Sequence, residues 1–243
     1  MITIRRSEER GHAKQDWIES YYTFSFASYY DPAHMGFRSL RVLNDDRIAA
    51  GRGFGAHAHR DMEILTYVLD GSLTHRDSMG QIQTFGENTI QVMSAGTGVI
   101  HSEFNGSERE AGHFLQIWIE PAVADVEPSY QQIAFDPGEK RGRFRLLAAP
   151  TGSNHTGAAA IHASIHQDAF IYAAELGPGE NLRQTLAPGR HAWVQVARGN
   201  VAIHGEANRE LLKEGDAAAF SEEREVSFTG EPGGSEFLFF DLA

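Results

Sequence analysis

Two pairs of side chains with the chemistry of metal ligands stand out in the sequence. His57 and His59 are separated by one residue, and so are His101 and Glu103. Residues i and i+2 of a β-strand point to the same face, so each pair presents two donors to one point. Imidazole nitrogens bind first-row transition metals such as Fe, Cu, Ni, Mn and Zn. Two such strands facing each other inside a barrel would bring three imidazoles and one carboxylate to a single ion and leave coordination positions open for a ligand, as in catalytic sites.

A plain structural interpretation competes with the metal site at each position. An isolated histidine is more often a surface or hydrogen-bonded residue than a ligand, and two donor pairs at the ends of expected strands favour the site. His75 and His113 have no partner at a suitable spacing, so we expect them to face solvent. We expect the histidines of the second half to be surface or core residues: His155, His162, His166, His191 and His204.

The elements that must position these donors are expected to be β-strands. Short apolar runs rich in β-branched and aromatic residues recur between Gly, Asp, Asn and Pro, and no long amphipathic helical pattern is present. Closely spaced strands with glycine turns predict an all-β barrel or sandwich. The expected strands are Ile64–Leu69, Thr89–Met93, Leu115–Glu120, Phe144–Leu147, Phe170–Leu176, Trp193–Val196, Val201–Ile203 and Phe237–Phe240.

The second half of the chain echoes the first. Gly71 and Gly86 bracket one pair of expected turns, and Gly199 and Gly215 bracket another whose spacing differs by a single residue. This repetition predicts a duplicated barrel. The polar segment 121–143, with three prolines, is interpreted as the linker, so the expected domains are 1–130 and 131–243.

The echo also predicts that the second barrel lacks a metal. If Gly199 corresponds to Gly71, then Thr185 and Ala187 take the places of the two clustered histidines. No histidine follows His204, so the second half offers no counterpart of His101. The expected metal site is therefore confined to domain 1–130.

Composition narrows the range of partners. With 21 basic against 33 acidic residues, the net charge of −12 would repel a polyanion, so we expect no nucleic-acid partner. The absence of cysteine excludes disulfides, thiolate zinc sites, iron–sulfur clusters and a cysteine nucleophile. Residues 1–10 are charged and no apolar run is long enough to span a bilayer, so we expect a cytoplasmic protein without membrane association. A monomer is the default expectation.

The residues around the donors resemble a known family. The spacing from Gly51 through the two histidines to Glu63, Gly-x5-His-x-His-x3-Glu, resembles the first cupin motif. The segment from Gly98 through His101 to Asn105 resembles the second motif, although Gly96 replaces its usual proline. The sequence around these motifs, residues 59–67 and 93–103, is similar to the pirin signature, and residues 22–26 and 29–32 are similar to the N-terminal segment of that family. The resemblance covers essentially the whole chain.

The resemblance implies a bicupin, with two tandem jelly-roll barrels of which only the N-terminal one keeps its metal. Two candidates remain for the fourth ligand, because general cupin spacing nominates Glu63 whereas the pirin resemblance nominates Glu103. We favour Glu103, which shares an expected strand with His101. Glu63 would then accept a hydrogen bond from a ligand imidazole.

Similarity to bacterial pirins described as quercetin 2,3-dioxygenases implies an enzyme that opens a flavonol with O2 and releases carbon monoxide. Fe(II) is the first expectation for the metal, with Mn, Ni, Co, Cu or Zn as alternatives. Glu103 would be both ligand and general base. Phe54, Met93 and Ile117 are the expected apolar contacts of the aromatic substrate. The alternative is a non-enzymatic regulator that responds to metal or redox state through protein partners, and an isomerase or lyase ranks last.

Overall fold

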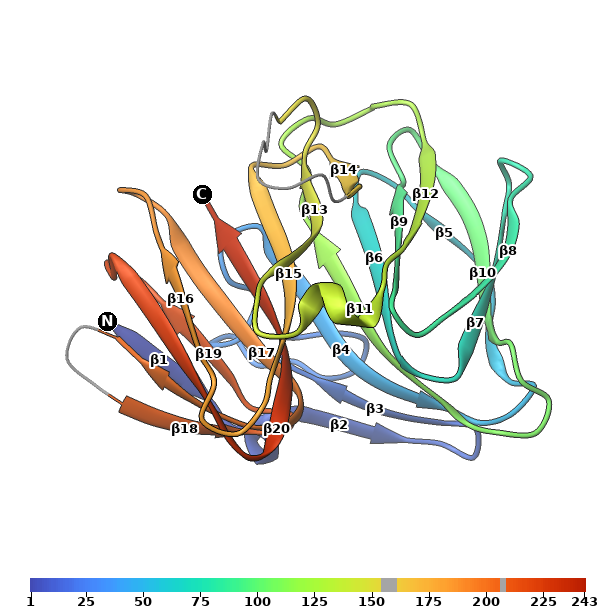
Figure 1. The fold of residues 1–243 in the computed structure, drawn as a ribbon. Coiled ribbons are helices and arrows are strands. Elements are labelled where there is room, and N and C mark those ends of the chain that lie inside the picture. Colours follow the sequence, from blue (N-terminus) through green and yellow to red (C-terminus); the bar gives the residue numbers. More distant parts are fainter. Residues whose placement is uncertain (154–160, 206–208) are drawn as a thin grey trace. The chain divides into compact units, whose positions relative to one another are not determined.

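Strands predominate throughout the described residues, which are 1–153, 161–205 and 209–243 of this computed structural model (Figure 1). They divide into two compact units that are each discontinuous in sequence. The N-terminal unit contains Gly11–Phe135 and Ala163–Gln167. The C-terminal unit contains Met1–Arg10, Asp136–His162 and Asp168–Ala243. The expected fold class, all-β with two barrels, is confirmed.

The N-terminal unit pairs a seven-stranded sheet, ordered β12-β9-β6-β11-β4-β3-β2, with a four-stranded sheet, ordered β5-β10-β7-β8. Leu73 and Phe85 of the smaller sheet pack on Ile48, Val68 and Phe114 of the larger one, so the core lies between the two. The strands are β2 (Gly11–Lys14), β3 (Ile18–Tyr22), β4 (Leu40–Ile48), β5 (Gly53–His59), β6 (Glu63–Asp70), β7 (Ser72–Asp77), β8 (Ile82–Gly86), β9 (Thr89–Ser94), β10 (Val99–Asn105), β11 (Gly112–Ile119), β12 (Ser129–Ala134) and β14 (Ala163–Ile165).

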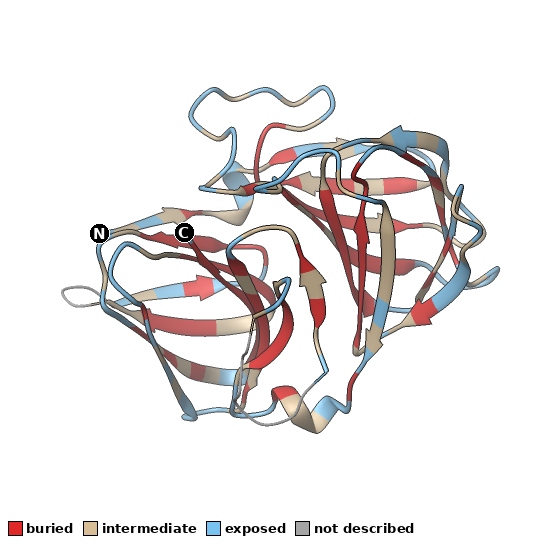
Figure 2. Ribbon diagram, turned by 90° about the horizontal axis from the view of Figure 1, so that it is seen from above, coloured by how far each residue is buried: buried red, intermediate tan, exposed pale blue. Residues whose placement is uncertain are grey.

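The C-terminal unit is built on two long strands, β17 and β20, that pair along most of their length. Its strand order is β1-β19-β17-β20-β15-β13, with β16 on β20 and β18 on β17. Buried phenylalanines, among them Phe228, Phe237 and Phe239, fill the interior, and Figure 2 shows the buried strands of each unit in red. The strands are β1 (Ile2–Arg5), β13 (Arg145–Pro150), β15 (Ala169–Leu176), β16 (Asn181–Thr185), β17 (His191–His204), β18 (Arg209–Lys213), β19 (Ala217–Phe220) and β20 (Glu225–Leu242).

Two segments belong to the other unit than the expected domain division assigns them to. Strand β1 pairs with β19, with Ile2 opposite Phe220, so the first residues complete the C-terminal unit. Residues 163–167 belong to the N-terminal unit although they follow the expected boundary at residue 130. The division into 1–130 and 131–243 treats each domain as one continuous run, which the compact units are not.

Every strand expected from the sequence falls mainly within an observed strand, with two differences of detail. Trp193–Val196 and Val201–Ile203 are one strand, β17, because Gly199 adopts a positive φ of 66° inside a bulge rather than in a turn between strands. The expected linker contains β12, which pairs with β9, and a 3-10 helix, η2 (Pro137–Lys140). Its prolines lie outside β12, where a missing N–H costs no ladder hydrogen bond.

Candidate metal centre

Strand β10 carries the candidate site because it lies between β5 and β7 in the four-stranded sheet. His101 is directly opposite His57 on β5, and Glu103 is opposite His75 on β7. Burial alternates along β10, with Ile100 and Phe104 exposed and both His101 and Glu103 buried. The alternation expected of an i, i+2 donor pair is therefore present.

The three predicted ligand histidines converge. Their ligand nitrogens all lie within 4.8 Å of one another, and Nε2 of His57 is 3.0 Å from Nε2 of His101. Two metal–nitrogen bonds of about 2.1 Å that meet at about 90° hold their nitrogens about 3.0 Å apart. The Nδ1–H of His57 donates to the carbonyl oxygen of Gly55 at 2.8 Å, which leaves its Nε2 with a lone pair. These residues fit a divalent transition-metal ion.

Burial keeps two members of this triad uncharged at neutral pH. Loss of solvation, followed by the neighbouring histidines, lowers the pKa of His101 to about 2. Loss of solvation and the charge of His57 lower the pKa of His59 to about 4. Neutral imidazoles have the lone pair that a metal needs, so ion binding at pH 7 requires no proton to be removed from either ring.

Glu103 lies in a second, overlapping donor group. Its carboxylate groups with His101 and His75, with the ligand atoms of all three within 4.8 Å of one another. Gln116 donates to Oε2 of Glu103 at 2.8 Å, and the Thr66 hydroxyl is 3.4 Å from Oε1. The four expected ligands therefore form two groups that share His101, and Glu103 approaches His101 without joining the close triad.

Glu63, the alternative fourth ligand, is bound elsewhere. It is 1% exposed, and its carboxylate accepts hydrogen bonds from the Ser94 hydroxyl at 2.6 Å and from His166 Nδ1 at 2.9 Å. Neither partner belongs to the histidine triad. The expected hydrogen bond from a ligand imidazole to Glu63 is replaced by one from His166, which ties residues 163–167 to β6. This arrangement favours Glu103 over Glu63.

Two histidines expected to face solvent are buried instead, so that prediction is wrong. His75 has no exposed surface and is 2.9 Å from the Asp77 carboxylate, and His113 is 2.7 Å from Asp45. His75 and Asp77 are themselves an i, i+2 pair, which is the signal that could have identified them. Of the second-half histidines, His166 contacts Glu63 and His155 lies outside the described residues.

Of the three residues expected to contact the substrate, one lies near the donors and two are buried in the core. Phe54 packs against Trp17, has its ring centroid 6.4 Å from that of His57, and lines a small cavity of about 10 Å³ that Glu103 also lines. Met93 and Ile117 are fully buried in the core and offer no surface to a ligand, a correction to their expected role. Trp118, which the sequence reasoning missed, packs edge-on against His59 with ring centroids 4.9 Å apart.

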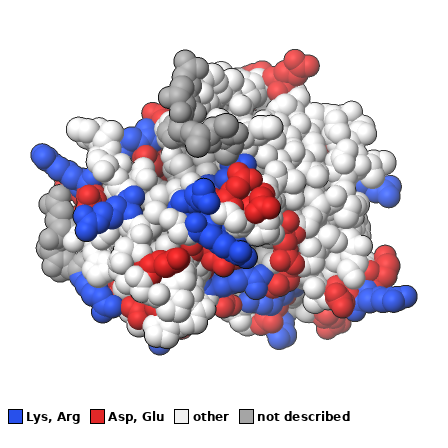
Figure 3. Space-filling view, in the orientation of Figure 1, with Lys and Arg blue, Asp and Glu red and all other residues white. Residues whose placement is uncertain are grey.

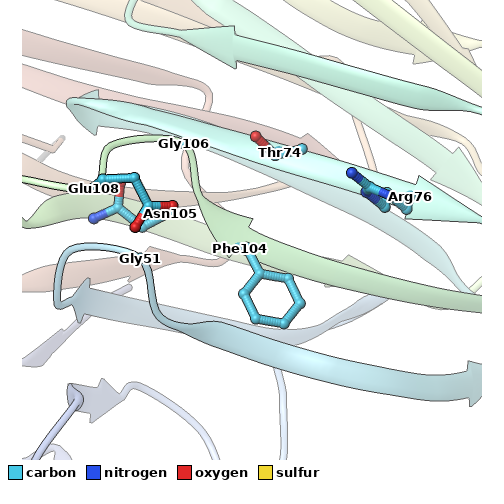
Figure 4. Close-up of a pocket in the computed structure, with 7 residues that line it drawn as sticks. All are labelled: Gly51, Thr74, Arg76, Phe104, Asn105, Gly106 and Glu108. Atoms are coloured by element: carbon cyan, nitrogen blue, oxygen red, sulfur yellow. The ribbon is translucent and has the colours of Figure 1, made fainter.

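Two surface hollows flank the strands that carry the site. One, of about 470 Å³, is lined by His59 together with Arg60, Ser78, Val99 and the outward-facing Ile100, among others, so it reaches the triad only at His59. The other lies on the outward face of β10, where Phe104, Thr74 and Arg76 surround it (Figure 4). Phe104 alternates with the inward-facing donors, so the second hollow opens away from them.

Close approach of the β5 and β10 backbones should be essential for the triad. A Cβ on Gly53 would lie 2.1 Å from the carbonyl oxygen of Glu103, whereas a Cβ on Gly55 would meet nothing within 4 Å. We expect Gly53→Ala to lower the free energy of unfolding by about 1–3 kcal/mol through overpacking and to weaken metal binding. Gly55→Ala is the matched control in the same strand. Urea denaturation and metal titration of both variants test this, and equal behaviour would contradict it.

Two buried carboxyls make the metal-free protein sensitive to pH. Burial, with the charge of Asp45 acting in the same direction, raises the pKa of Asp46 to about 7, and burial followed by the charge of Asp46 raises that of Glu103 to about 7. A carboxyl with a raised folded-state pKa favours folding while protonated, and this contribution is lost as the pH rises through about 7. We expect the free energy of unfolding to fall between about pH 4 and pH 7 and to level off above that, by at most about 4 kcal/mol per group.

Urea denaturation at several pH values with a chelator present measures this decline. Asp46→Asn should flatten the curve, because the amide has no proton to lose in this range. An unchanged slope in that variant would show that Asp46 is not one of the groups responsible.

Comparison with known proteins agrees with this architecture. The profile of the family Pirin matches residues 3–119, and that of the quercetinase C-terminal cupin domain matches residues 146–242. A quercetin 2,3-dioxygenase of Escherichia coli K12 is 43% identical over 242 residues, which covers 100% of this chain and 99% of that protein. A pirin-like protein of Caulobacter vibrioides is 37% identical over 229 residues, covering 94% of each.

Solved structures give the same result. The crystal structure of YhhW from Escherichia coli has a TM-score of 0.90 and 42% identity, and covers 100% of this chain and 98% of that one. The bacterial pirin YhhW in complex with nickel(II) has a TM-score of 0.89 and 42% identity, covering 100% and 99%. Fold and donor cluster together define a bicupin with one candidate centre for a divalent metal among the described residues. The chain belongs to the pirin family.

Proposed function

We propose that this pirin is a metal-dependent dioxygenase that cleaves flavonols such as quercetin with O2 and releases carbon monoxide. The observation that carries the proposal is the convergence of three imidazoles, two of them held neutral by burial, on one point beside a buried carboxyl. Relatives that align over the whole chain at 43% identity are named quercetin 2,3-dioxygenase, which supports the substrate class.

His57, His59 and His101 would hold the ion, with Glu103 as the proposed fourth ligand. The bound ion would supply Lewis acidity for the substrate hydroxyl and a place for O2. We place Fe(II) first, with Mn, Ni, Co, Cu or Zn as alternatives, because three imidazoles and a carboxylate accept most first-row divalent ions. The nickel(II) complex of a relative supports a divalent ion without deciding among them.

Glu103 would act on the proton of the substrate hydroxyl. Burial raises its pKa to about 7, close to the value at which a general base works best near neutral pH. Gln116 donates to one carboxylate oxygen at 2.8 Å, and the Thr66 hydroxyl donates to the Gln116 amide oxygen at 2.8 Å, so the group is held in place while it takes the proton. Phe54 would form part of the apolar wall next to this carboxyl.

The hollow beside His59 is the proposed path for the substrate. It is bordered by the apolar Val99 and Ile100 and by Arg60, whose guanidinium also pairs with Asp61 and Asp125. On the face seen in Figure 3, basic and acidic side chains are intermixed. The role of Phe54 as a residue of the substrate pocket and the entry of the substrate beside His59 both stay proposals.

The test is dioxygen uptake with quercetin by protein loaded in turn with Fe(II), Mn(II), Ni(II), Co(II) and Cu(II). Consumption of O2 and release of carbon monoxide in equal amounts is the expected result. Absence of turnover with every metal, in protein shown to bind the ion, would overturn the enzymatic proposal. Retention of metal-dependent partner binding in that case would favour the regulatory alternative.

The C-terminal cupin unit is proposed to hold no metal. Among its described residues no group of three metal-ligating side chains converges, and phenylalanines fill its interior. No described helix has the length and apolar character needed to cross a membrane. The cytoplasmic location, the monomeric state and the absence of a nucleic-acid partner stay predictions.

A further inference from the structure

A chain of hydrogen bonds leads away from the histidine triad on the side opposite His57. Nδ1 of His101 lies 3.4 Å from Nδ1 of His75, and Nε2 of His75 lies 2.9 Å from Oδ2 of Asp77. The side chains of His75 and Asp77 are both fully buried. The chain therefore runs from a carboxylate through one imidazole to a second imidazole, whose remaining nitrogen faces His57.

The direction of these hydrogen bonds follows from which atoms can donate. A carboxylate only accepts, so Nε2 of His75 carries the hydrogen. A neutral imidazole with its hydrogen on Nε2 has its lone pair on Nδ1, so Nδ1 of His75 is an acceptor. The hydrogen between the two rings must then come from Nδ1 of His101. Neutral His101 consequently has its lone pair on Nε2, which is the atom that lies 3.0 Å from Nε2 of His57.

Asp77 is itself held firmly. Its other oxygen, Oδ1, accepts hydrogen bonds from the backbone N–H of Met79 at 2.9 Å and of Gln81 at 3.0 Å, in the turn between β7 and β8. Tyr130 packs on the His75 ring with centroids 4.8 Å apart. The carboxylate and the ring it orients are thus fixed by the turn and by β12, independently of any ion.

We propose that Asp77 and His75 are positioning residues that fix the tautomer and orientation of His101, so that its Nε2 is presented to the metal. A hydrogen-bonded partner on the far nitrogen is a common requirement for a ligand histidine, and its loss typically costs 10–100-fold in metal affinity or activity. The inference rests on the proposed metal centre in one respect, that His101 is a ligand. It assigns a function to two residues that otherwise would be only buried polar groups.

The replacement Asp77→Asn tests the direction of the chain with almost no change of shape. The amide oxygen can keep the two bonds to the turn, which places the amide NH2 opposite His75. His75 must then accept at Nε2 and donate from Nδ1, and neutral His101 must carry its hydrogen on Nε2, where the ion would bind. We expect the Kd for Ni(II), measured by competition with a chromogenic chelator at fixed pH, to rise about 10–100-fold.

The matched control is Asp45→Asn. Asp45 and His113 form another buried pair in the same unit, 2.7 Å apart, and Asp45 also pairs with Arg47 at 3.1 Å. We expect Asp45→Asn to leave the Kd within about threefold of the wild type, a change below half a decade. A Kd for Asp77→Asn that matches the control, in folded protein, would overturn the proposal. Failure of the wild type to bind Ni(II) would instead refute the proposed metal centre, so the two failures are distinguishable.

A second pair of variants covers the case in which Asp77→Asn does not fold. The amide of His75→Gln can accept from His101 and donate to Asp77, whereas His75→Phe fills the space without doing either. We expect the glutamine variant to bind Ni(II) more tightly than the phenylalanine variant, and the Co(II) absorption spectrum of the glutamine variant to resemble that of the wild type. Equal affinities, or two ions bound per wild-type chain with His75 as a ligand of the second, would overturn the assignment.

Discussion

His57→Ala should abolish flavonol turnover and weaken metal binding by about 10²- to 10³-fold while the fold remains intact. Sites with four protein ligands bind zinc with about 10–16 kcal/mol, so one ligand accounts for roughly 3–4 kcal/mol. His57 is half-buried on β5 and contacts Gly55 and the neighbouring rings, so its removal leaves no buried charge without a partner. Metal affinity by chelator competition and O2 uptake are the measurements.

His12→Ala is the control for this variant. His12 lies on β2 of the same unit and contacts Glu19 at 3.1 Å, away from the triad. It should leave both metal affinity and turnover unchanged. If His57→Ala bound metal as tightly as the wild type, the convergence of the three rings would have no role in holding an ion, and the proposed function would lose its basis.

Glu103→Gln should lower kcat by about 10²- to 10⁴-fold, the range for loss of a positioned general base. The amide is close to the carboxylate in shape, and a rotation can retain one bond to Thr66 or Gln116. The amide has no site for the substrate proton, so the loss should fall on kcat more than on KM. Metal affinity should also fall if Glu103 is a ligand, and steady-state kinetics on fully loaded protein separates the two effects.

Glu63→Gln decides between the two candidate carboxylates. Since Glu63 bonds Ser94 and His166, its replacement should reduce stability through those bonds and leave metal affinity within about threefold of the wild type. The reverse pattern, with Glu63→Gln losing the ion and Glu103→Gln keeping it, would assign the fourth ligand to Glu63 as general cupin spacing suggests.

The donor histidines could be predicted because they depend on local geometry. An i, i+2 pair in a strand points to one face whatever the rest of the fold does, so His57, His59 and His101 could be named before the strands were placed. The strands themselves could be predicted from short apolar runs for the same reason. The burial of Met93 and Ile117 could not, since it depends on which face of each strand is covered by the rest of the unit.

What the sequence reasoning missed is mostly long-range. His75 reaches His101 only because β7 pairs with β10 in one register, a contact between strands that are separated by β8 and β9 in the chain. His166 meets Glu63 across more than a hundred positions. The placement of β1 beside β19 likewise depends on pairing between the two ends of the described chain. Spacing rules carry no information about such pairings.

The pairing of β1 with the distant β19 affects when this part of the sheet can form during translation. Strand β1 is synthesised about two hundred residues before β19, its partner in the sheet, so this pairing cannot form until β19 has left the ribosome. Closing a loop of that length is entropically costly and slow, which places this pairing late in folding. A fragment of residues 1–135 would contain β1 without its partner strand and would lack residues 163–167. We expect this fragment to aggregate through the unpaired strand edge, whereas the chain of residues 1–243 folds.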